Sequence, residues 1–208
     1  MNLKLRNLKQ VLMKKYDIIY ADPAWQYGSK ELYGDKTKEG KRENRFRKLE
    51  RIYDTMSLAD IKQLPVKNMI AKNSACFLWV TDSHLKQGIE VLESWGFKYK
   101  TVAFVWIKKT SKGNTFVNFA PWTLKSSEIC LLGMKGTMGK LKTDNTVRQL
   151  IEAERTKHSK KPNEARERIE QLFADANRIE LFARENHVGW DAWGNEVEVC
   201  TDLSEYCV

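Results

Sequence analysis

The sequence contains no apolar run of about 18 residues, which predicts that no segment spans a membrane. Residues 1–16 carry several lysines but have neither a continuous apolar core nor a small-residue cleavage site, so we expect no signal peptide. The four cysteines, Cys76, Cys130, Cys200 and Cys207, include no CxxC pair. This spacing argues against a zinc site or a disulfide framework, and it predicts a reducing, cytoplasmic compartment.

What the chain does contain fits one folded domain, residues 1–208. Its 208 residues are 42% hydrophobic and include seven tryptophans, enough for a substantial core. Lysine and arginine number 36 against 27 aspartate and glutamate residues, which gives a net charge of +9. A basic surface suits a polyanionic partner, although the same charge can serve solubility alone.

The most informative stretch is Asp17–Tyr27, which reads DIIYADPAWQY. Its first five residues have the composition of a buried strand, with two isoleucines and a tyrosine. Asp22 follows where that strand should end, and Pro23 stops the strand because proline has no N–H for the ladder. Trp25 and Tyr27 then place two flat rings beside one carboxylate. Such a set at the end of a strand is typical of a pocket for a flat, hydrogen-bonding ligand.

Segments of strand and helix character alternate along the chain. We expect helices at 57–64, 83–95 and 162–174 and strands at 17–22, 74–80, 101–107, 127–133 and 178–183, with 147–154 open to either assignment. Ser57 and Ser83 are the predicted N-caps of the first two helices, and Gly96 is a predicted C′ residue. The alternation predicts an α/β fold with a mostly parallel, doubly wound sheet. Ligands of such sheets lie beyond the carboxyl ends of the strands.

Three stretches are expected outside the regular elements. Residues 1–16 form a short amphipathic lead-in. Residues 28–52 form a long polar loop, whose position just after Trp25 predicts a mobile flap over the site. Residues 108–125 form a second substrate-facing loop, with three aromatic side chains expected to be exposed: Phe116, Phe119 and Trp122.

For several residues the sequence favours packing over function. His84 is expected on a helix surface, and Tyr53 is balanced between packing and substrate contact. Glu128 is expected either to face the pocket or to pair with a lysine. Four tryptophans are expected in the core: Trp79, Trp95, Trp106 and Trp193.

Five short motifs follow one another along the chain: DPAW at 22–25, YDTMS at 53–57, HSKKPNE at 158–164, ELFAR at 180–184 and GWDAWGNE at 189–196. Each is weak alone, but through their order and spacing residues 17–197 resemble the DPPW-type N6-adenine methyltransferases. That family includes the catalytic subunit of the messenger-RNA adenosine methyltransferase and many phage and bacterial DNA enzymes. The sequence departs from DPPW at Ala24, which stands in place of the second proline.

The resemblance implies a Rossmann-like, S-adenosylmethionine-dependent methyltransferase fold with a permuted order of strands. In this order the catalytic strand comes first and the cofactor strand last, and the two lie side by side. A glycine-rich cofactor loop is absent from the sequence, and its absence is a feature of the family.

The DPAW residues suggest how such an enzyme would act on adenine. The exocyclic amine is a poor nucleophile because its lone pair is delocalised into the ring. If Asp22 accepts one N–H and the Pro23 carbonyl accepts the other, the lone pair can turn toward the methyl donor. Trp25, with Tyr27, would stack on the purine. No step requires a metal, and the predicted substrate contacts are Ala24, Tyr27 and Tyr53.

The resemblance also implies where S-adenosylmethionine binds. Lys161 precedes Pro162 and a helix N-terminus, and it matches the lysine that holds the carboxylate of the cofactor. The ribose hydroxyls would contact residues at matching family positions: Arg184, Asn186, His187, Asn195 and Glu196. Because a base inside a duplex is out of reach, the enzyme would flip its adenine out or act on a single strand.

The leading hypothesis is a site-specific DNA adenine-N6 methyltransferase of phage or bacterial type, because the chain lacks an added zinc module and a long disordered tail. RNA is the second candidate substrate. One alternative is a catalytically silent nucleic-acid-binding subunit, which Ala24 in place of proline keeps open. Another is methylation of a different amine, such as cytosine N4, whose enzymes use similar four-residue motifs.

Overall fold

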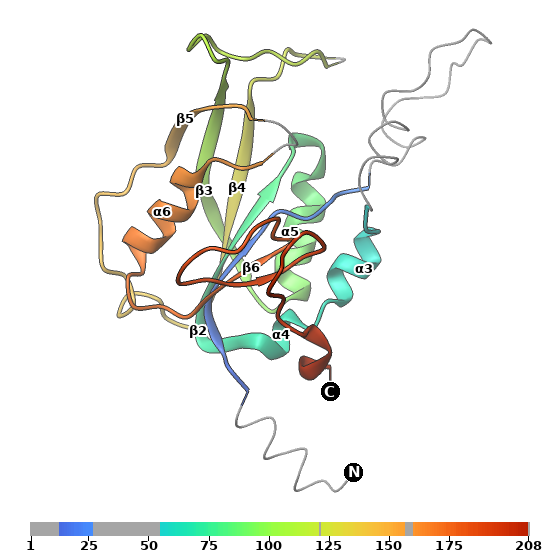
Figure 1. Ribbon diagram of the computed structural model, residues 1–208, viewed down its shortest axis with the longest axis vertical. Helices are drawn as coiled ribbons and strands as arrows, with labels where there is room; N and C mark the ends of the chain where they lie inside the picture. Colours follow the sequence, from blue (N-terminus) through green and yellow to red (C-terminus); the bar gives the residue numbers. More distant parts are fainter. Residues whose placement is uncertain (1–12, 27–54, 121, 157–159, 208) are drawn as a thin grey trace, which may run out of the picture.

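The computed structural model describes residues 13–26, 55–120, 122–156 and 160–207. Within these ranges the strands form one seven-stranded sheet, in the spatial order β5-β3-β4-β2-β1-β6-β7 (Figure 1). The strands are β1 (Tyr16–Ala21), β2 (Ile70–Val80), β3 (Lys98–Lys109), β4 (Ser127–Lys135), β5 (Leu150–Glu154), β6 (Arg178–Leu181) and β7 (Asp191–Trp193). The helices are α3 (Leu58–Gln63), α4 (Val66–Met69), α5 (Leu85–Ser94) and α6 (Asn163–Leu172), with short 3₁₀ turns η1 (Asp82–His84) and η3 (Leu203–Tyr206).

The sheet is mostly parallel, as the alternation of strands and helices predicts. β1 lies between β2 and β6 and runs parallel to both, while β7 runs parallel to β6 and β5 parallel to β3. Among the described strands, β4 alone is reversed, because it pairs antiparallel with both β2 and β3. The other strands therefore share one carboxyl edge, where open α/β sheets bind their ligands.

Helices cover both faces of the sheet, so its central strands are buried on both sides. Along β1, Ile19 and Ala21 belong to the core beneath α3, α4 and α5, whereas Ile18 and Tyr20 belong to the core beneath α6. Burial on both faces explains why this strand reads as a continuous apolar run. Three of the tryptophans predicted in the core are at most 1% exposed, and Trp193 packs partly buried against it.

Several strands are longer than the sequence predicts. β2 begins at Ile70 instead of residue 74, and β3 covers Lys98–Lys109 instead of 101–107. The added residues are largely polar or exposed, so the apolar run alone underestimates both strands. Residues 150–154, which the sequence left between helix and strand, form β5 because they pair with β3.

Local capping predicts two helix ends correctly and one incorrectly. The Ser57 side chain caps α3, and Gly96 adopts a φ of 89° just after α5, both as predicted. The predicted N-cap Ser83 is wrong, because η1 intervenes and α5 begins only after His84. The Ser83 hydroxyl instead lies 3.3 Å from Nδ1 of His84.

The connection from β3 to β4 is an extended hairpin that projects beyond the carboxyl edge of the sheet (Figure 1). We call residues 110–126, of which residue 121 lies outside the described ranges, the finger. Two backbone hydrogen bonds between Asn118 and Lys125, of 2.7 and 2.9 Å, join its legs. The predicted loop at 108–125 is therefore partly ordered as a hairpin, and its first two residues belong to β3.

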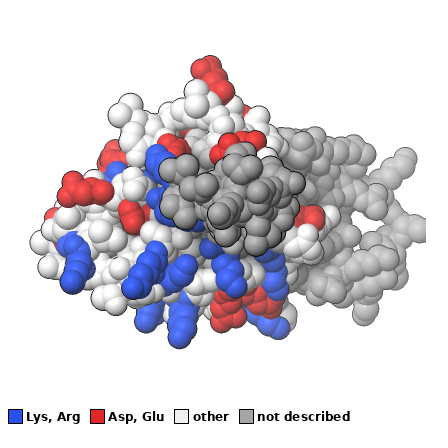
Figure 2. Space-filling model, turned by 90° about the horizontal axis from the view of Figure 1, so that it is seen from below, with Lys and Arg blue, Asp and Glu red and all other residues white. Residues whose placement is uncertain are grey.

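Two predicted segments fall wholly or mostly outside the described residues: the loop at 28–52 and the lead-in, of which residues 1–12 are not described. In the described ranges, no helix is long and apolar enough to cross a membrane. Seen from below, on the side where β1 begins, basic side chains line one margin of the molecule (Figure 2). Positive charge is therefore present on the side of the molecule away from the carboxyl edge.

Candidate active site

The turn formed by Asp22–Trp25 leaves the carboxyl end of β1. The Trp25 N–H donates to the Pro23 carbonyl at 2.8 Å, and the Met56 N–H donates to the Ala24 carbonyl at 3.1 Å. These bonds hold the turn although Ala24 lacks the ring of a proline. The Pro23 carbonyl, a predicted acceptor for the adenine amine, already accepts one hydrogen bond and has a second lone pair.

The ends of β1 and β6 lie side by side. Ala21, directly before Asp22, stands opposite Leu181, the last residue of β6. The DPAW turn and the end of the ELFAR motif therefore follow neighbouring parallel strands. This confirms the adjacency of the first strand and the late strand, on which the predicted transfer depends.

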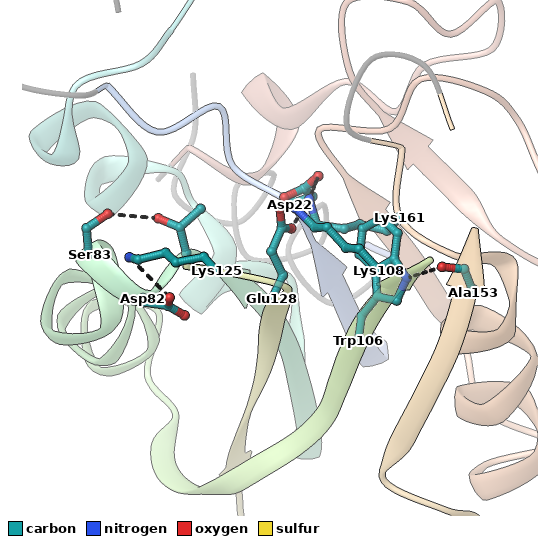
Figure 3. A network of polar contacts seen from close by, with 10 residues as sticks. Asp22, Asp82, Ser83, Trp106, Lys108, Lys125, Glu128, Ala153 and Lys161 are labelled. Atoms are coloured by element: carbon teal, nitrogen blue, oxygen red, sulfur yellow. Dashed lines mark hydrogen bonds and ion pairs between the residues drawn. The ribbon is translucent and has the colours of Figure 1, made fainter. Parts of the chain in front are cut away.

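Asp22 is the first of four side chains of alternating charge that contact one another in sequence (Figure 3). Nζ of Lys161 lies 2.6 Å from Oδ2 of Asp22 and 3.1 Å from Oε2 of Glu128. Oε1 of Glu128 lies 2.5 Å from Nζ of Lys108. These four residues, which we call the charge cluster, come from the end of β1, the end of β3, the start of β4 and the segment before α6. Two acids and two lysines leave the cluster without net charge.

The pKa values within the charge cluster shift in different directions. Burial raises the pKa of Asp22 above its ordinary value, although the Lys161 ammonium opposes this rise. Burial also disfavours the charged form of Glu128, but Lys161 and Lys108 outweigh it and hold the pKa of Glu128 below its usual value. Against the burial of its own ammonium, Lys161 has a pKa raised by Asp22 and Glu128. Asp22 is thus the carboxylate that takes up a proton more readily.

The cluster contains residues that sequence reasoning resolved only in part. For Glu128 the pairing alternative is confirmed, since its two carboxylate oxygens contact Lys108 and Lys161. Lys108 was missed, because its place beside Asp22 depends on the spatial order of β3, β4 and β2. Lys161 was predicted from the resemblance to hold the cofactor, and the structure places its ammonium on Asp22.

Trp25 lies in the core beneath the turn. Its ring is 7% exposed, and its Nε1 donates to the Trp79 carbonyl at 3.2 Å. His84 stacks on it, with ring centroids 5.4 Å apart and 24° between the planes. The predicted surface position of His84 is wrong, since the residue is 6% exposed. It is held there by the Thr81 hydroxyl, 2.9 Å from Nδ1, and by a hydrogen bond with the backbone of Gln26.

The end of β6 is shaped by its backbone. Phe182, directly after the strand, has a φ of 62°, which is uncommon for a residue with a side chain. Its ring meets the Trp193 ring edge-on, with centroids 5.3 Å apart. Gly194 approaches Ala183 so closely that a Cβ would lie 2.0 Å from the Ala183 carbonyl oxygen. Glycine is therefore required where the two segments meet.

The predicted cofactor residues after β6 fall in two segments, 184–187 and 195–196. The side chain of Asn186 donates to the Val199 carbonyl at 2.7 Å and accepts from the Val199 N–H at 3.2 Å, which ties the first segment to the chain just after the second. Nε of Arg184 lies 3.9 Å from Oε1 of Glu196. Of the other two predicted cofactor residues, His187 has its Nε2 3.1 Å from Oε1 of Glu185, whereas Asn195 is exposed. Tyr27 and Tyr53 lie outside the described residues.

A family model described as MT-A70 matches residues 16–196, a range that includes both strand ends and the whole charge cluster. The chain belongs to the MT-A70 family. This confirms the resemblance inferred from the five motifs. It also agrees with the observed α/β sheet, since MT-A70 proteins are methyltransferases that generally use S-adenosylmethionine.

Named relatives of this MT-A70 chain differ in length. It is 38% identical over 205 residues to the Type II methyltransferase M.MunI of Mycoplasma sp., and the alignment covers 94% of this chain and 85% of that protein. It is 30% identical over 196 residues to the human N(6)-adenine-specific methyltransferase METTL4, covering 88% of this chain and 38% of METTL4. It is 27% identical over 199 residues to the human N(6)-adenosine-methyltransferase catalytic subunit METTL3, covering 93% and 30%.

Proposed function

We propose that this protein transfers the methyl group of S-adenosylmethionine to the N6 amine of adenine in DNA. The observation that carries the proposal is the position of Asp22, which follows β1 directly beside the end of β6. An acceptor site on one strand and a donor site on its neighbour would meet across this seam. Membership of the MT-A70 family supports the reaction type.

Asp22 would accept a hydrogen bond from the adenine amine, and the Pro23 carbonyl would accept a second. When the amine nitrogen takes the methyl group, the methyl–sulfur bond of the donor would break and the nitrogen would lose a proton, and the raised pKa of Asp22 suits it to receive that proton. Lys161 orients the carboxylate from 2.6 Å, and Glu128 in turn holds Lys161 from 3.1 Å. The acceptor is thereby positioned before the substrate arrives, which lowers the cost of reorganisation during the reaction.

S-Adenosylmethionine would supply an electrophilic methyl group. The end of β6 offers a set of side chains that suits its ribose and charged groups: Arg184, Asn186, His187, Asn195 and Glu196. Lys161 would contact its carboxylate, since this residue stands just before the N-terminus of α6, which favours anions. The backbone shape around Phe182 and Gly194 would set the distance between the donor and Asp22.

DNA is the favoured substrate because the chain matches M.MunI, a Type II methyltransferase, over most of the length of both proteins. The net charge of +9 suits any nucleic acid. Tyr27 and Tyr53 remain proposed contacts of the base. RNA is the alternative substrate, because METTL3, one of the similar proteins, is an adenosine methyltransferase.

Mass spectrometry of nucleosides tests this proposal. The protein is incubated with S-adenosylmethionine and either DNA from a bacterial strain without adenine methylation or an RNA transcript. We expect N6-methyldeoxyadenosine from the DNA alone, and none from the Asp22→Ala variant, whose melting temperature should stay close to that of the wild type. Methylated adenosine from the RNA alone would identify RNA as the substrate, and N4-methylcytosine would identify cytosine as the methylated base. Methylation that survives in Asp22→Ala would refute the role of Asp22.

A silent nucleic-acid-binding subunit predicts a different pair of results. Such a protein would give no methylated nucleoside and no rise in melting temperature at saturating S-adenosylmethionine. We expect the cofactor to raise the melting temperature, because it would bind only the folded state.

A further inference from the structure

The finger, residues 110–126, carries the most exposed aromatic side chains of the described chain. Trp122 is 96% exposed and Phe119 is 81% exposed, and they are accompanied by Leu124 at 61%. The sequence predicted the exposure of Phe119 and Trp122 correctly, whereas Phe116, also predicted to be exposed, is only partly exposed. An exposed group of large apolar side chains on one loop contributes little to folding and marks a site of interaction.

Both legs of the finger rise from the active site. β3 ends at Lys109, and the outgoing leg then turns back at residues 110–114, so that the Phe116 N–H donates to the Lys108 carbonyl at 2.7 Å. The returning leg enters β4 just before Glu128, which pairs with Lys108 at 2.5 Å. Glu128 also contacts Lys161, the residue that holds Asp22. The finger therefore starts within the charge cluster and extends outward from the edge at which the substrate adenine would be held.

The base of the finger is braced on both sides. The Arg155 guanidinium lies 4.7 Å from the centroid of the Phe116 ring on the outgoing leg. On the returning leg, Nζ of Lys125 lies 3.1 Å from Oδ2 of Asp82 (Figure 3). A braced base with an exposed aromatic tip is suited to pressing a rigid side chain into a partner.

The charge of the finger favours a nucleic-acid partner. Residues 110–126 contain two lysines and no aspartate or glutamate. Of the two, Lys125 pairs with Asp82, and Lys108 and Lys109 just before the finger pair with Glu128 and Glu152, whereas Lys112 is exposed. Exposed aromatic rings beside the exposed Lys112 suit a nucleic acid, because a ring can stack on a base while the ammonium contacts a phosphate.

We propose that the finger is a wedge for duplex DNA, in which Trp122 enters the base stack and fills the space left by the flipped adenine. The proposal rests on the proposed function, because a wedge is needed only if the target base leaves a duplex. Apolar side chains that enter a base step are an established way of compensating for lost stacking. Phe119 and Leu124 would pack against the sugars beside the opened step.

Acrylamide quenching of tryptophan fluorescence gives a direct test. All seven tryptophans lie in described ranges, and the other six are buried or partly buried, so Trp122 dominates the quenchable signal. The Asp22→Ala protein is titrated with a mixed-sequence DNA duplex, without any need for methyl transfer. We expect the duplex to protect Trp122 from acrylamide. In a methylation assay we expect Trp122→Phe to stay close to the wild-type rate on duplex DNA, because its ring can also enter the base stack.

Methylation rates provide the second test. We expect Trp122→Ala to slow methylation of duplex DNA roughly 5- to 150-fold, the range of one lost stacking contact. The same DNA converted to single strands should be methylated by Trp122→Ala within about twofold of the wild-type rate, because no base needs to be displaced. Tyr99→Ala is the matched control, since it removes an aromatic ring that is 39% exposed near the opposite end of β3.

The outcomes separate this proposal from others. If DNA binds but acrylamide quenches Trp122 as strongly as it does without DNA, the wedge is refuted. Protection that grows with protein concentration in the absence of DNA would refute it as well, because a second copy of the chain would then cover the finger. If wild-type protein methylates no DNA while duplex still protects Trp122, the proposed function fails and the DNA contact of the finger stands.

Discussion

The neighbouring ends of β1 and β6 are built in different ways. At the end of β1, the carboxylate of Asp22 is held by side-chain charge, through Lys161 and Glu128 from distant parts of the chain. At the end of β6, the form of the site comes from the backbone, through the positive φ of Phe182 and the close approach of Gly194 to Ala183. Changes at the first end should alter charge and pKa, whereas changes at the second should alter shape and fit.

The largest effect is expected from Lys161→Gln, which removes the cation that pairs with Asp22 and Glu128 at the end of β1. The variant leaves Asp22 and Glu128 facing each other without their shared cation, so we expect a loss of about 3–5 kcal/mol in the free energy of unfolding at neutral pH. Methyl transfer should be lost with it. Urea denaturation measures the stability, and Lys160→Gln is the control. Lys160 pairs with Glu185 at 2.5 Å but is 40% exposed, so its loss should cost at most about 1 kcal/mol.

The pH dependence of this loss follows from Glu128. Its folded pKa is lowered, so it contributes stability above its unfolded pKa, and this contribution is lost as the pH falls through the folded pKa. The raised pKa of Lys161 makes its own contribution fade only in strongly alkaline solution. The gap in stability between wild type and Lys161→Gln should therefore narrow as the pH falls from neutral into the acid range. A gap that widens on acidification would contradict the assigned ion pairs.

Gly194→Ala breaks the other end through shape alone. The added Cβ would lie 2.0 Å from the Ala183 carbonyl oxygen and 2.8 Å from its nitrogen, so backbone must move. We expect a cost of about 1–3 kcal/mol in the free energy of unfolding. We also expect weaker binding of S-adenosylmethionine, measured by titration calorimetry, with no change in the pH dependence of stability. Gly139→Ala is the matched control, because a Cβ there would meet nothing within 4 Å. Equal losses of stability in Gly194→Ala and Gly139→Ala would show that the close approach of Gly194 to Ala183 is not the cause.

The two ends also differ in how far the sequence predicts them. The β1 end was found because its strand is buried on both faces and therefore reads as an apolar run that stops at Asp22-Pro23. The motifs placed the late strand beside it, and the pairing of Ala21 with Leu181 agrees. These features are local or come from a motif, so one sequence suffices to predict them.

The missed features depend on contacts between distant segments. Lys108 joins the charge cluster only because the reversed strand β4 lies between β3 and β2. His84 has the sequence context of a helix surface, yet tertiary packing brings its ring onto Trp25. Trp25 itself was expected to stack on the purine, and the ring lies in the core. Neither spacing nor composition reports such packing.

The smallest effect is expected from His84→Ala. It tests whether packing, as well as charge, holds Asp22 at the end of β1. His84 stacks on Trp25 and bonds the backbone of Gln26, directly after the turn that contains Ala24. His84→Ala should cost about 1–2 kcal/mol, from one ring contact and one hydrogen bond. It should lower kcat more than it raises KM for DNA, since the turn would lose rigidity while the surfaces that bind DNA remain.

A second substitution distinguishes rigidity from general damage. Ala24→Pro restricts the backbone of the same turn, so the double variant His84→Ala/Ala24→Pro should have a higher kcat than His84→Ala alone. Single-turnover rates at saturating DNA measure this difference, and Leu85→Ala, a 40% exposed neighbour, controls for changes at the start of α5. If proline restores the melting temperature without restoring kcat, His84 serves only the stability of the fold. Recovery of kcat would show that packing beneath the turn, together with the charge cluster above it, keeps Asp22 in place.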